Sequence, residues 1–249
     1  MRLSTFGMTD AGRKRPGNED AILVVPELAL AVVCDGMGGH EAGEVASRTA
    51  VEAIYAWFTG GGDEGERYNL DPNIPAPARK LASSVFYADE AIRQAVVEAP
   101  EHAGMGTTVV AALIEDGMLF VAHAGDSRCY LGRGRGLIQV TLDHTVVGDL
   151  LRAGVITEGQ AVHVKKNAIT RALGVTEGLI VDVDQVHLGL GDTVLLCSDG
   201  LHGLINDASI GSLVCSGTPL EDTCKNLIDA ANEAGGSDNI SAVLLRLER

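Results

Sequence analysis

Short apolar runs, bounded by glycine, aspartate or proline, recur along most of the chain. Runs of this length between turn residues are typical of β-strands. The pattern predicts strands at Ala21–Val25, Leu28–Cys34, Thr108–Ile114, Met118–Ala124, Arg128–Leu131, Leu137–Val140, Leu179–His187, Thr193–Cys197 and Ile240–Leu247. Several of these runs follow one another too closely for a crossover helix, so we expect largely antiparallel pairing.

Three longer segments carry apolar residues at helical spacing instead. One stripe runs through Ala42, Val45, Ala46, Ala50, Ala53, Ile54 and Trp57, and similar stripes occupy Ala78–Val97 and Leu220–Ala234. Such stripes predict amphipathic helices that bury one face. Strands flanked by long helices, without strict alternation of the two, predict an α+β fold in which helices cover antiparallel sheets.

Two polar segments interrupt this pattern. The stretch TGGGDEGERYNLDPNIPAPAR is rich in glycine, proline and acidic residues, and we interpret it as a surface loop between the first two helices. A second insert, about residues 145–167, contains a short predicted helix, VVGDLLRAGV, followed by a polar linker. We expect one domain over residues 1–249, with this insert as a small subdomain.

Composition and charge narrow the classes of function. The chain has 249 residues, 46% of them hydrophobic, which is enough for a substantial core. Its formal net charge of −15 argues against nucleic acid or anionic lipid as a partner, since both require a basic face. No signal-peptide core or membrane-spanning apolar run is present, so we expect a cytoplasmic protein, or a part of a larger one. The five cysteines form no C-x-x-C pair and are expected to be small buried residues.

Aspartates mark the ends of several predicted strands. LALAVVCDG and DTVLLCSDG are apolar strands that finish on Asp-Gly, at Asp35 and Asp199. Asp126 lies in a tight connection between two strands, and Asp238 lies just before the last one. A single Asp-Gly is most often a turn, but four carboxylates gathered at one sheet edge would repel one another without a cation. Oxygen ligands without a histidine or cysteine cluster favour Mg²⁺ or Mn²⁺ over Zn²⁺.

A series of motifs along the chain resembles those of one family, in the same order. The motifs are TDAGRKRPGNEDA, VVCDGMGGHEAGEVAS, GMGTTVVAAL, VAHAGDSRCYL, LDHT, NAITRALG, LLCSDGL and GGSDNISAVLL. They are similar to those of the metal-dependent serine/threonine protein phosphatases, the type 2C or PPM family, in their bacterial form. The resemblance implies a four-layer α-β-β-α sandwich of two antiparallel sheets flanked by helix pairs. It also implies a metal centre at one end, with the insert as a flap beside it.

The resemblance implies metal-binding roles for individual residues. Asp35 would bridge two metal ions, and Gly36 would offer its carbonyl to one of them. Asp199 and Asp238 would complete the other ion's coordination, and Asp126 with Asp199 would hold a third ion. The implied cofactor is Mn²⁺ or Mg²⁺, as two core ions and a weaker third.

Three further residues match positions around the metals. Glu19 and Asp20 match an acidic pair that orients metal-bound water, and Arg15 matches the phosphate-binding arginine. A planar guanidinium suits two phosphate oxygens at once. Without the spacing from Arg15 to Asp20, the run Arg13–Arg15 would be interpreted as an ordinary solvated basic segment.

The implied activity is hydrolysis of phosphoserine and phosphothreonine by direct attack of a metal-bridging water. Two cations can lower the pKa of such a water and aim it in line at phosphorus. His40 is a candidate general acid for the leaving alkoxide, although a lone histidine that opens a helix is more often structural. Val164 and Lys166 depart from the family's usual flap sequence, where proline and arginine are expected, and His202 stands where other residues are common.

Two other functions stay open from the sequence alone. A non-catalytic phosphoprotein-binding pseudophosphatase would be expected to lack ligands, and all are present here. A small-molecule phosphomonoesterase is compatible with the motifs, because metals and arginine recognise only the phosphoryl group. A serine hydrolase built on Ser127 is disfavoured, since Cys129 replaces the last glycine of G-x-S-x-G. We expect a monomer that acts on phosphorylated proteins, the targets of a serine/threonine kinase.

Overall fold

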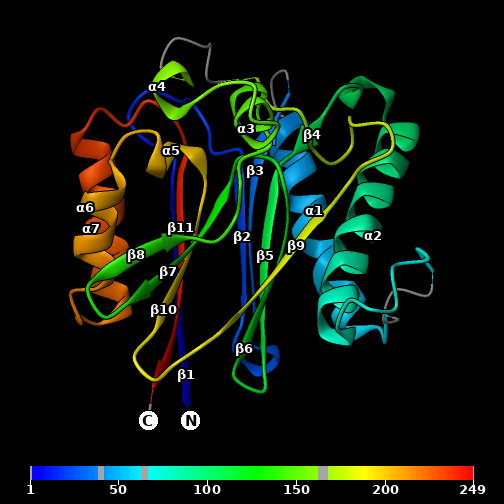
Figure 1. Ribbon diagram of the computed structural model, residues 1–249. Helices are drawn as coiled ribbons and strands as arrows, with labels where there is room; N and C mark the ends of the chain where they lie inside the picture. The colour runs from blue at the N-terminus through cyan, green and yellow to red at the C-terminus, as the bar shows by residue number, and fades with distance from the viewer. Residues whose placement is uncertain (1, 39–41, 63–66, 162–167, 249) are drawn as a thin grey trace.

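Two antiparallel β-sheets stack face to face between two layers of helices (Figure 1). The computed structural model describes residues 2–38, 42–62, 67–161 and 168–248. The first sheet contains, in spatial order, β1 (Arg2–Asp10), β11 (Ile240–Glu248), β10 (Thr193–Cys197), β7 (Arg128–Arg133) and β8 (Gly136–Gln139). The second contains β2 (Asp20–Val25), β3 (Leu30–Met37), β5 (Val109–Glu115), β6 (Met118–Ala124) and β9 (Asp182–His187), with β4 (Gly106–Thr107) paired to β3. The predicted α+β sandwich is confirmed.

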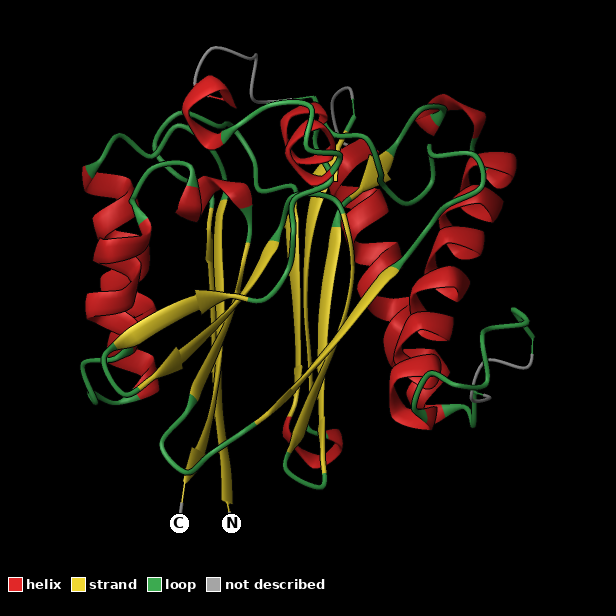
Figure 2. Ribbon diagram, in the orientation of Figure 1, coloured by secondary structure: helices red, strands yellow, loops and turns green. Residues whose placement is uncertain are grey.

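The longer helices form the two outer layers (Figure 2). α1 (Ala42–Thr59) and α2 (Ala76–Glu98) cover the second sheet, and α6 (Asp207–Val214) and α7 (Leu220–Glu233) cover the first. The short helices are α3 (Val146–Arg152), α4 (Glu158–Ala161), α5 (Asp199–His202), η1 (Pro26–Leu28) and η2 (Pro100–His102). None of the helices in the described part of the chain has both the length and the apolar character needed to cross a membrane.

Alternate residues of the central strands point into different layers of the core. In β3, Leu30, Val32 and Cys34 pack towards α1 and α2, whereas Ala31 and Val33 pack between the two sheets. Because both faces of such a strand are buried, its sequence is a continuous apolar run. All five cysteines are free, and four of them are buried as predicted, whereas Cys215 is half-buried.

The starts of two strands differ from what the local sequence predicts. β1 is absent from the prediction, because its apolar residues, such as Phe6 and Met8, are irregularly spaced among polar ones. Its pairing with β11 along its whole length and the packing of both side chains under α7 establish it. The strand predicted from Leu28 begins at Leu30, because Ala29 ends η1 in the left-handed conformation, with φ of 49°.

The sheet topology brings the predicted aspartates to one end of the sandwich. β3 ends there, β10 leads there into α5, and the β6–β7 and α7–β11 connections lie there, opposite the chain termini (Figure 1). Asp20 at the start of β2 pairs directly with Asp35 of β3. Cys197, the last residue of β10, pairs with Arg128 of β7 and Ala242 of β11. The strand register thus places all five carboxyl-bearing segments around one edge.

Candidate metal centre

Asp20 connects the two sheets at the end where the aspartates gather. Only 7% of its surface is exposed. Its Oδ2 accepts hydrogen bonds from the Ser198 hydroxyl at 2.7 Å and the Ser241 hydroxyl at 2.6 Å. Ser198 follows β10 and Ser241 lies in β11, so both come from the first sheet. The Asp20 Oδ1 is buried and has no partner among the described residues. One oxygen is therefore fixed by the two sheets, and the other is available to a ligand.

Two threonines fix the backbone of Asp35. Its N–H donates to Thr108 Oγ1 at 3.1 Å, and its carbonyl accepts from the Thr108 N–H and the Thr107 hydroxyl, both at 2.9 Å. The Thr108 hydroxyl also lies 2.7 Å from Ser127 Oγ, on the residue that follows Asp126. These contacts tie the end of β3 to the β6–β7 turn and thereby fix Asp35 relative to Asp126.

Asp126 lies in the tight turn between β6 and β7. Gly125 adopts φ of +118°, and a Cβ on it would lie 2.5 Å from the Thr108 Cβ, so the turn requires glycine. Asp126 is 8% exposed, and its Oδ1 has no partner among the described residues. Its carbonyl accepts a hydrogen bond from His202 Nε2 at 3.0 Å. His202, which matches no sequence motif, therefore supports this turn.

Asp199 and Asp238 lie on segments that touch because Gly200 has no side chain. Asp199 begins α5, and Asp238 precedes β11. A Cβ on Gly200 would lie 1.9 Å from the Asn239 carbonyl oxygen and 3.4 Å from the Asp238 Cβ. Asp238 Oδ2 accepts a hydrogen bond from Arg15 Nη2 at 2.7 Å, and 49% of the Arg15 side chain is exposed. Arg15 therefore lies beside the carboxylates and faces solvent.

Glu19 and Gly36 lie together where β2, β3 and the start of α1 meet. The Glu19 carbonyl accepts the Gly36 N–H at 3.1 Å and the Ser47 hydroxyl at 2.6 Å. A Cβ on Gly43 would lie 2.7 Å from Glu19 Oε2, so the carboxylate rests against the first turn of α1. The Glu19 N–H donates to the Asn239 Oδ1 at 2.8 Å, which links this pair to the segment that carries Asp238.

Burial and mutual repulsion disfavour the ionised forms of these carboxyl groups. Burial raises the pKa of Asp20 to about 7, and burial together with the charge of Asp199 raises the pKa of Asp126 to about 7. The pKa of Asp35 is raised by burial and then by Asp20 and Asp199. Burial and the charge of Asp238 raise the pKa of Asp199, against a hydrogen bond with Asp35 that lowers it.

This set of residues fits a divalent cation. Its donors are oxygens, which Mg²⁺ and Mn²⁺ prefer. The buried oxygens of Asp20 and Asp126 lack partners, and unpaired carboxylates at such depth are costly. A bound cation would satisfy the Asp126 oxygen and offset the repulsion, and water at the site would satisfy the Asp20 oxygen. The predicted ligands of two ions stay Asp35, Asp199, Asp238 and the Gly36 carbonyl. The predicted ligand of a third ion stays Asp126.

The raised pKa values of Asp20 and Asp126 predict how stability depends on pH. In the folded chain these groups hold protons that the unfolded chain releases at lower pH, so their effect is to lower stability as pH rises from about 4 to about 7, above which the loss levels off. In EDTA, a change from pH 6 to pH 7 should lower the free energy of unfolding by about 1 kcal/mol for each group, relative to a variant that lacks the group. Urea unfolding at the two pH values measures the change.

Matched variants separate this effect from other titrations. The pKa values of His144 and His202 are lowered to about 4, mainly by burial, so these rings stay neutral in the folded chain and titrate only in the unfolded one. They add a rise in stability with pH that is the same in every variant compared. Asparagine at both Asp20 and Asp126 should make stability rise more steeply from pH 6 to pH 7 than in the wild type, by about 2 kcal/mol for the two groups. Asp229→Asn on the exposed face of α7 should keep the wild-type pH dependence. Equal pH dependence of stability in the chelated wild type and the double asparagine variant between pH 6 and pH 7 would contradict the repulsion.

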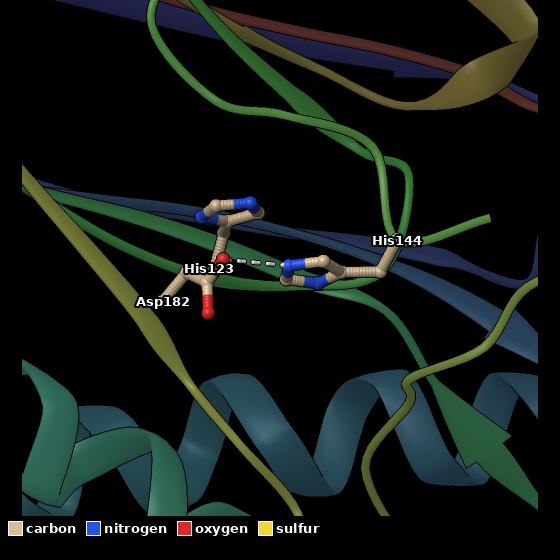
Figure 3. A group of neighbouring side chains, drawn as sticks. All are labelled: His123, His144 and Asp182. Atoms are coloured by element: carbon tan, nitrogen blue, oxygen red, sulfur yellow. Dashed lines mark hydrogen bonds and ion pairs between the residues drawn. The ribbon is translucent and has the colours of Figure 1, made fainter. Parts of the chain in front are cut away.

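A compact group of metal-ligating side chains lies elsewhere, where the sequence analysis expects none. His123, His144 and Asp182 each place one ligand atom within 4.8 Å of the others (Figure 3). No other group of three in the described ranges meets this distance, and the predicted aspartates are more widely spaced. The β6–β9 pairing sets His123 opposite Asp182. This long-range pairing is the only signal that could have revealed the group.

The geometry of the histidine group does not suit a cation. The two imidazole rings stack with their centroids 4.5 Å apart and their planes at 6° (Figure 3). A ring nitrogen binds a metal through a lone pair in its ring plane, so two stacked parallel rings do not converge on one ion. Arg171 Nη1 lies 2.6 Å from Asp182 Oδ1 and 3.0 Å from His144 Nε2, which places a positive charge there. The aspartates remain the candidate metal centre.

Part of the prediction falls outside the described residues. His40, the candidate general acid, lies there, as do Val164 and Lys166 of the insert. The role of His40 and the effect of the two insert departures therefore stay predictions.

Comparison with known proteins agrees with the fold and with the chemistry of the site. Residues 14–240 match the family described as Protein phosphatase 2C. Protein phosphatase PhpP of Streptococcus pneumoniae is 36% identical over 245 residues, which cover 96% of each chain. The crystal structure of the serine/threonine phosphatase PstP/Ppp of Mycobacterium tuberculosis superposes with a TM-score of 0.86 at 33% identity, over 100% of each chain.

A further solved structure bears on the cofactor. It is the catalytic domain of the serine/threonine protein phosphatase PstP in complex with two manganese ions. It superposes with a TM-score of 0.82 at 32% identity and covers 99% of each chain. Both the sequence match and the structural similarity extend over the segments that carry the clustered aspartates. The chain belongs to the protein phosphatase 2C family of serine/threonine protein phosphatases.

Proposed function

We propose that this protein removes phosphate from phosphoserine and phosphothreonine in proteins, with Mn²⁺ or Mg²⁺ as its cofactor. The observation that carries the proposal is the gathering of aspartates at one end of the sandwich, where buried oxygens of Asp20 and Asp126 lack partners and burial and repulsion raise the pKa of Asp35. The similarity to PhpP and to PstP, the latter solved with two manganese ions, supports the same activity.

Within this proposal, Asp35, Asp199, Asp238 and the Gly36 carbonyl hold two ions, and Asp126 with Asp199 holds a third. When bound, divalent cations activate water for attack on phosphorus and neutralise charge on the phosphoryl oxygens. The residues of the chain supply the geometry, because hydrogen bonds fix the backbone of Asp35 and one carboxylate oxygen of Asp20 before any ligand arrives.

The groups around the ions orient the water and the leaving group. Asp20, fixed by Ser198 and Ser241, accepts hydrogen bonds from water in the site through its free oxygen, and Glu19 lies beside it. His40 donates a proton to the alkoxide that leaves from the phosphorylated side chain. The substrates are proteins phosphorylated by a serine/threonine kinase, and the enzyme acts as a cytoplasmic monomer.

Arg15 is the proposed phosphate-binding residue, and its replacement should weaken substrate binding. Its guanidinium is already anchored by Asp238 and half exposed, so it can bind two phosphoryl oxygens in a fork. Because a charged hydrogen bond contributes roughly 1.5–3 kcal/mol, Arg15→Ala should raise KM for a phosphothreonine peptide about tenfold or more. Arg15→Lys should recover part of the loss, and Lys14→Ala should change little. An unchanged KM in Arg15→Ala would refute this role.

The experiment that tests the function compares substrates and metals in one assay. Purified protein is incubated with a phosphothreonine peptide, a phosphoserine peptide, p-nitrophenyl phosphate and a sugar phosphate, each with Mn²⁺ and with EDTA. Release of phosphate from the peptides in Mn²⁺, and none in EDTA, is the expected result. Hydrolysis of the small phosphates alone would favour a small-molecule phosphomonoesterase. Tight peptide binding without turnover in Mn²⁺ would favour a binding protein.

A further inference from the structure

His144 lies at a buried position between the insert and the turn that carries Asp126. It has no exposed surface. Its backbone N–H donates to the Gly125 carbonyl at 2.9 Å, and its ring Nδ1 accepts the Gly125 N–H at 3.1 Å. One residue therefore satisfies both backbone polar groups of the glycine that precedes Asp126.

The second nitrogen of the His144 ring is fixed from the other side. Because Nδ1 accepts a hydrogen bond, the proton of the neutral ring is on Nε2, which donates to Asp182 Oδ2 at 3.1 Å (Figure 3). Arg171 holds the other oxygen of Asp182 at 2.6 Å, and the His123 ring stacks on the imidazole. The ring can neither rotate nor exchange its partners without breaking several contacts.

The same residue is tied to the segment that follows the insert. The His144 carbonyl accepts the Thr170 N–H at 2.8 Å, and the Val146 N–H donates to the Ala168 carbonyl at 3.0 Å. Arg171, which anchors Asp182, belongs to this segment as well. His144 thus joins both ends of the insert to the Asp126 turn.

The Asp126 turn needs such support. Gly125 adopts a φ of +118°, which residues with a side chain rarely adopt, and a Cβ there would lie 2.5 Å from the Thr108 Cβ. Asp126 Oδ1 has no partner in the described part of the chain, so no contact of that oxygen fixes its direction. The direction of the carboxylate therefore follows from the backbone of the turn, which His144 holds at Gly125, His202 at the Asp126 carbonyl and Thr108 at Ser127.

We propose that His144, held in place by Asp182 and Arg171, is a positioning residue for Asp126. Through its bond to the Gly125 N–H, it sets the affinity of the weakest cation site. This inference rests on the proposed role of Asp126 as a metal ligand. Residues that orient metal ligands typically contribute roughly ten- to hundredfold in metal affinity.

Two substitutions at His144 separate its two ring contacts. In His144→Asn, the amide oxygen can take the place of Nδ1 and accept from Gly125, whereas the contact with Asp182 is lost. In His144→Gln, the amide lies near the position of Nε2 and can contact Asp182, whereas the acceptor for Gly125 is lost. Electron paramagnetic resonance of free Mn²⁺ during a titration gives the number and affinity of sites, independently of activity.

The expected result is asymmetric. His144→Gln should raise the dissociation constant of the weakest Mn²⁺ site roughly ten- to hundredfold, and His144→Asn should keep most of the affinity. The tighter sites should change little in either variant. His187→Gln, on the exposed end of β9, is the matched control and should titrate like the wild type. Urea unfolding in EDTA reports whether each variant folds.

The outcomes distinguish the positioning role of His144 from the metal-binding role of Asp126. If Asp126→Asn leaves the Mn²⁺ titration unchanged, the metal role of Asp126 is wrong. If Asp126→Asn removes the weak site but His144→Gln does not weaken it, the positioning role of His144 is wrong. If His144→Asn and His144→Gln lose the same Mn²⁺ affinity at the weakest site, the positioning role of His144 is also wrong. Should His144→Gln not fold, Asp182→Ala replaces it, and unchanged affinity of the weakest site in that variant would overturn the inference.

Discussion

Replacement of Asp35 by asparagine is expected to lower the rate of phosphopeptide hydrolysis about a thousandfold or more, without unfolding the protein. Asp35 is the predicted bridge between two ions, and loss of several kcal/mol of metal-derived stabilisation corresponds to a factor of this size. The chelated variant should be at least as stable as the chelated wild type. Asparagine removes a group whose pKa is raised by burial and by the charges of Asp20 and Asp199.

Two measurements check this prediction. Steady-state hydrolysis of a phosphothreonine peptide in Mn²⁺ gives the rate, and urea unfolding in EDTA gives the stability. Asp229→Asn, an exposed aspartate on α7, is the matched control and should keep full activity. A variant of Asp35 that retains more than about a tenth of the wild-type rate would be incompatible with a bridging role.

Addition of one methyl group at Gly36 is expected to destabilise the fold strongly. A Cβ at this position would lie 2.2 Å from the Gly43 carbonyl oxygen and 2.5 Å from the Glu19 carbonyl oxygen. Both obstacles are backbone atoms, and the Gly36 N–H is bonded to the same Glu19 carbonyl, so the chain cannot yield without losing that bond. Gly36→Ala should lower the free energy of unfolding by about 3 kcal/mol.

The comparison for this substitution is another glycine of the same region. A Cβ on Gly17 meets no atom within 4 Å, so Gly17→Ala should change the free energy of unfolding by less than about 0.5 kcal/mol. Urea unfolding of the two variants in EDTA measures both effects without the contribution of metal. Equal stability of Gly36→Ala and Gly17→Ala would show that the close approach of β3 to α1 is not required.

The core strands were predictable because both of their faces are buried. β3 and β10 are continuous apolar runs, and each run stops at the aspartate that leaves the core, so Asp35 and Asp199 are visible in the sequence itself. β1 gives no such signal, because it is recognised by its pairing with β11, the strand farthest from it in the sequence. Local pattern reveals burial, whereas edge pairing depends on the whole fold.

The supporting residues of the site could not be predicted for a related reason. Ser198, Ser241 and Thr108 are single hydroxyl-bearing residues without a local motif, and their bonds to Asp20 and Asp35 follow from strand register. His144 and Asp182 meet because β9 pairs with β6, a connection that spans the insert. The candidate metal ligands could be identified from residue type. The residues that orient them could be identified only from the fold.

Diffraction from crystals soaked in Mn²⁺, measured at the manganese absorption edge, would locate the cations directly. Anomalous difference peaks are predicted beside the carboxylates of Asp35, Asp199 and Asp238, and a weaker peak beside Asp126. The His123–His144–Asp182 group should show no peak, because its rings are stacked and Arg171 lies against it. Absence of manganese at the aspartates, or a peak at the histidine group alone, would contradict the proposed metal centre.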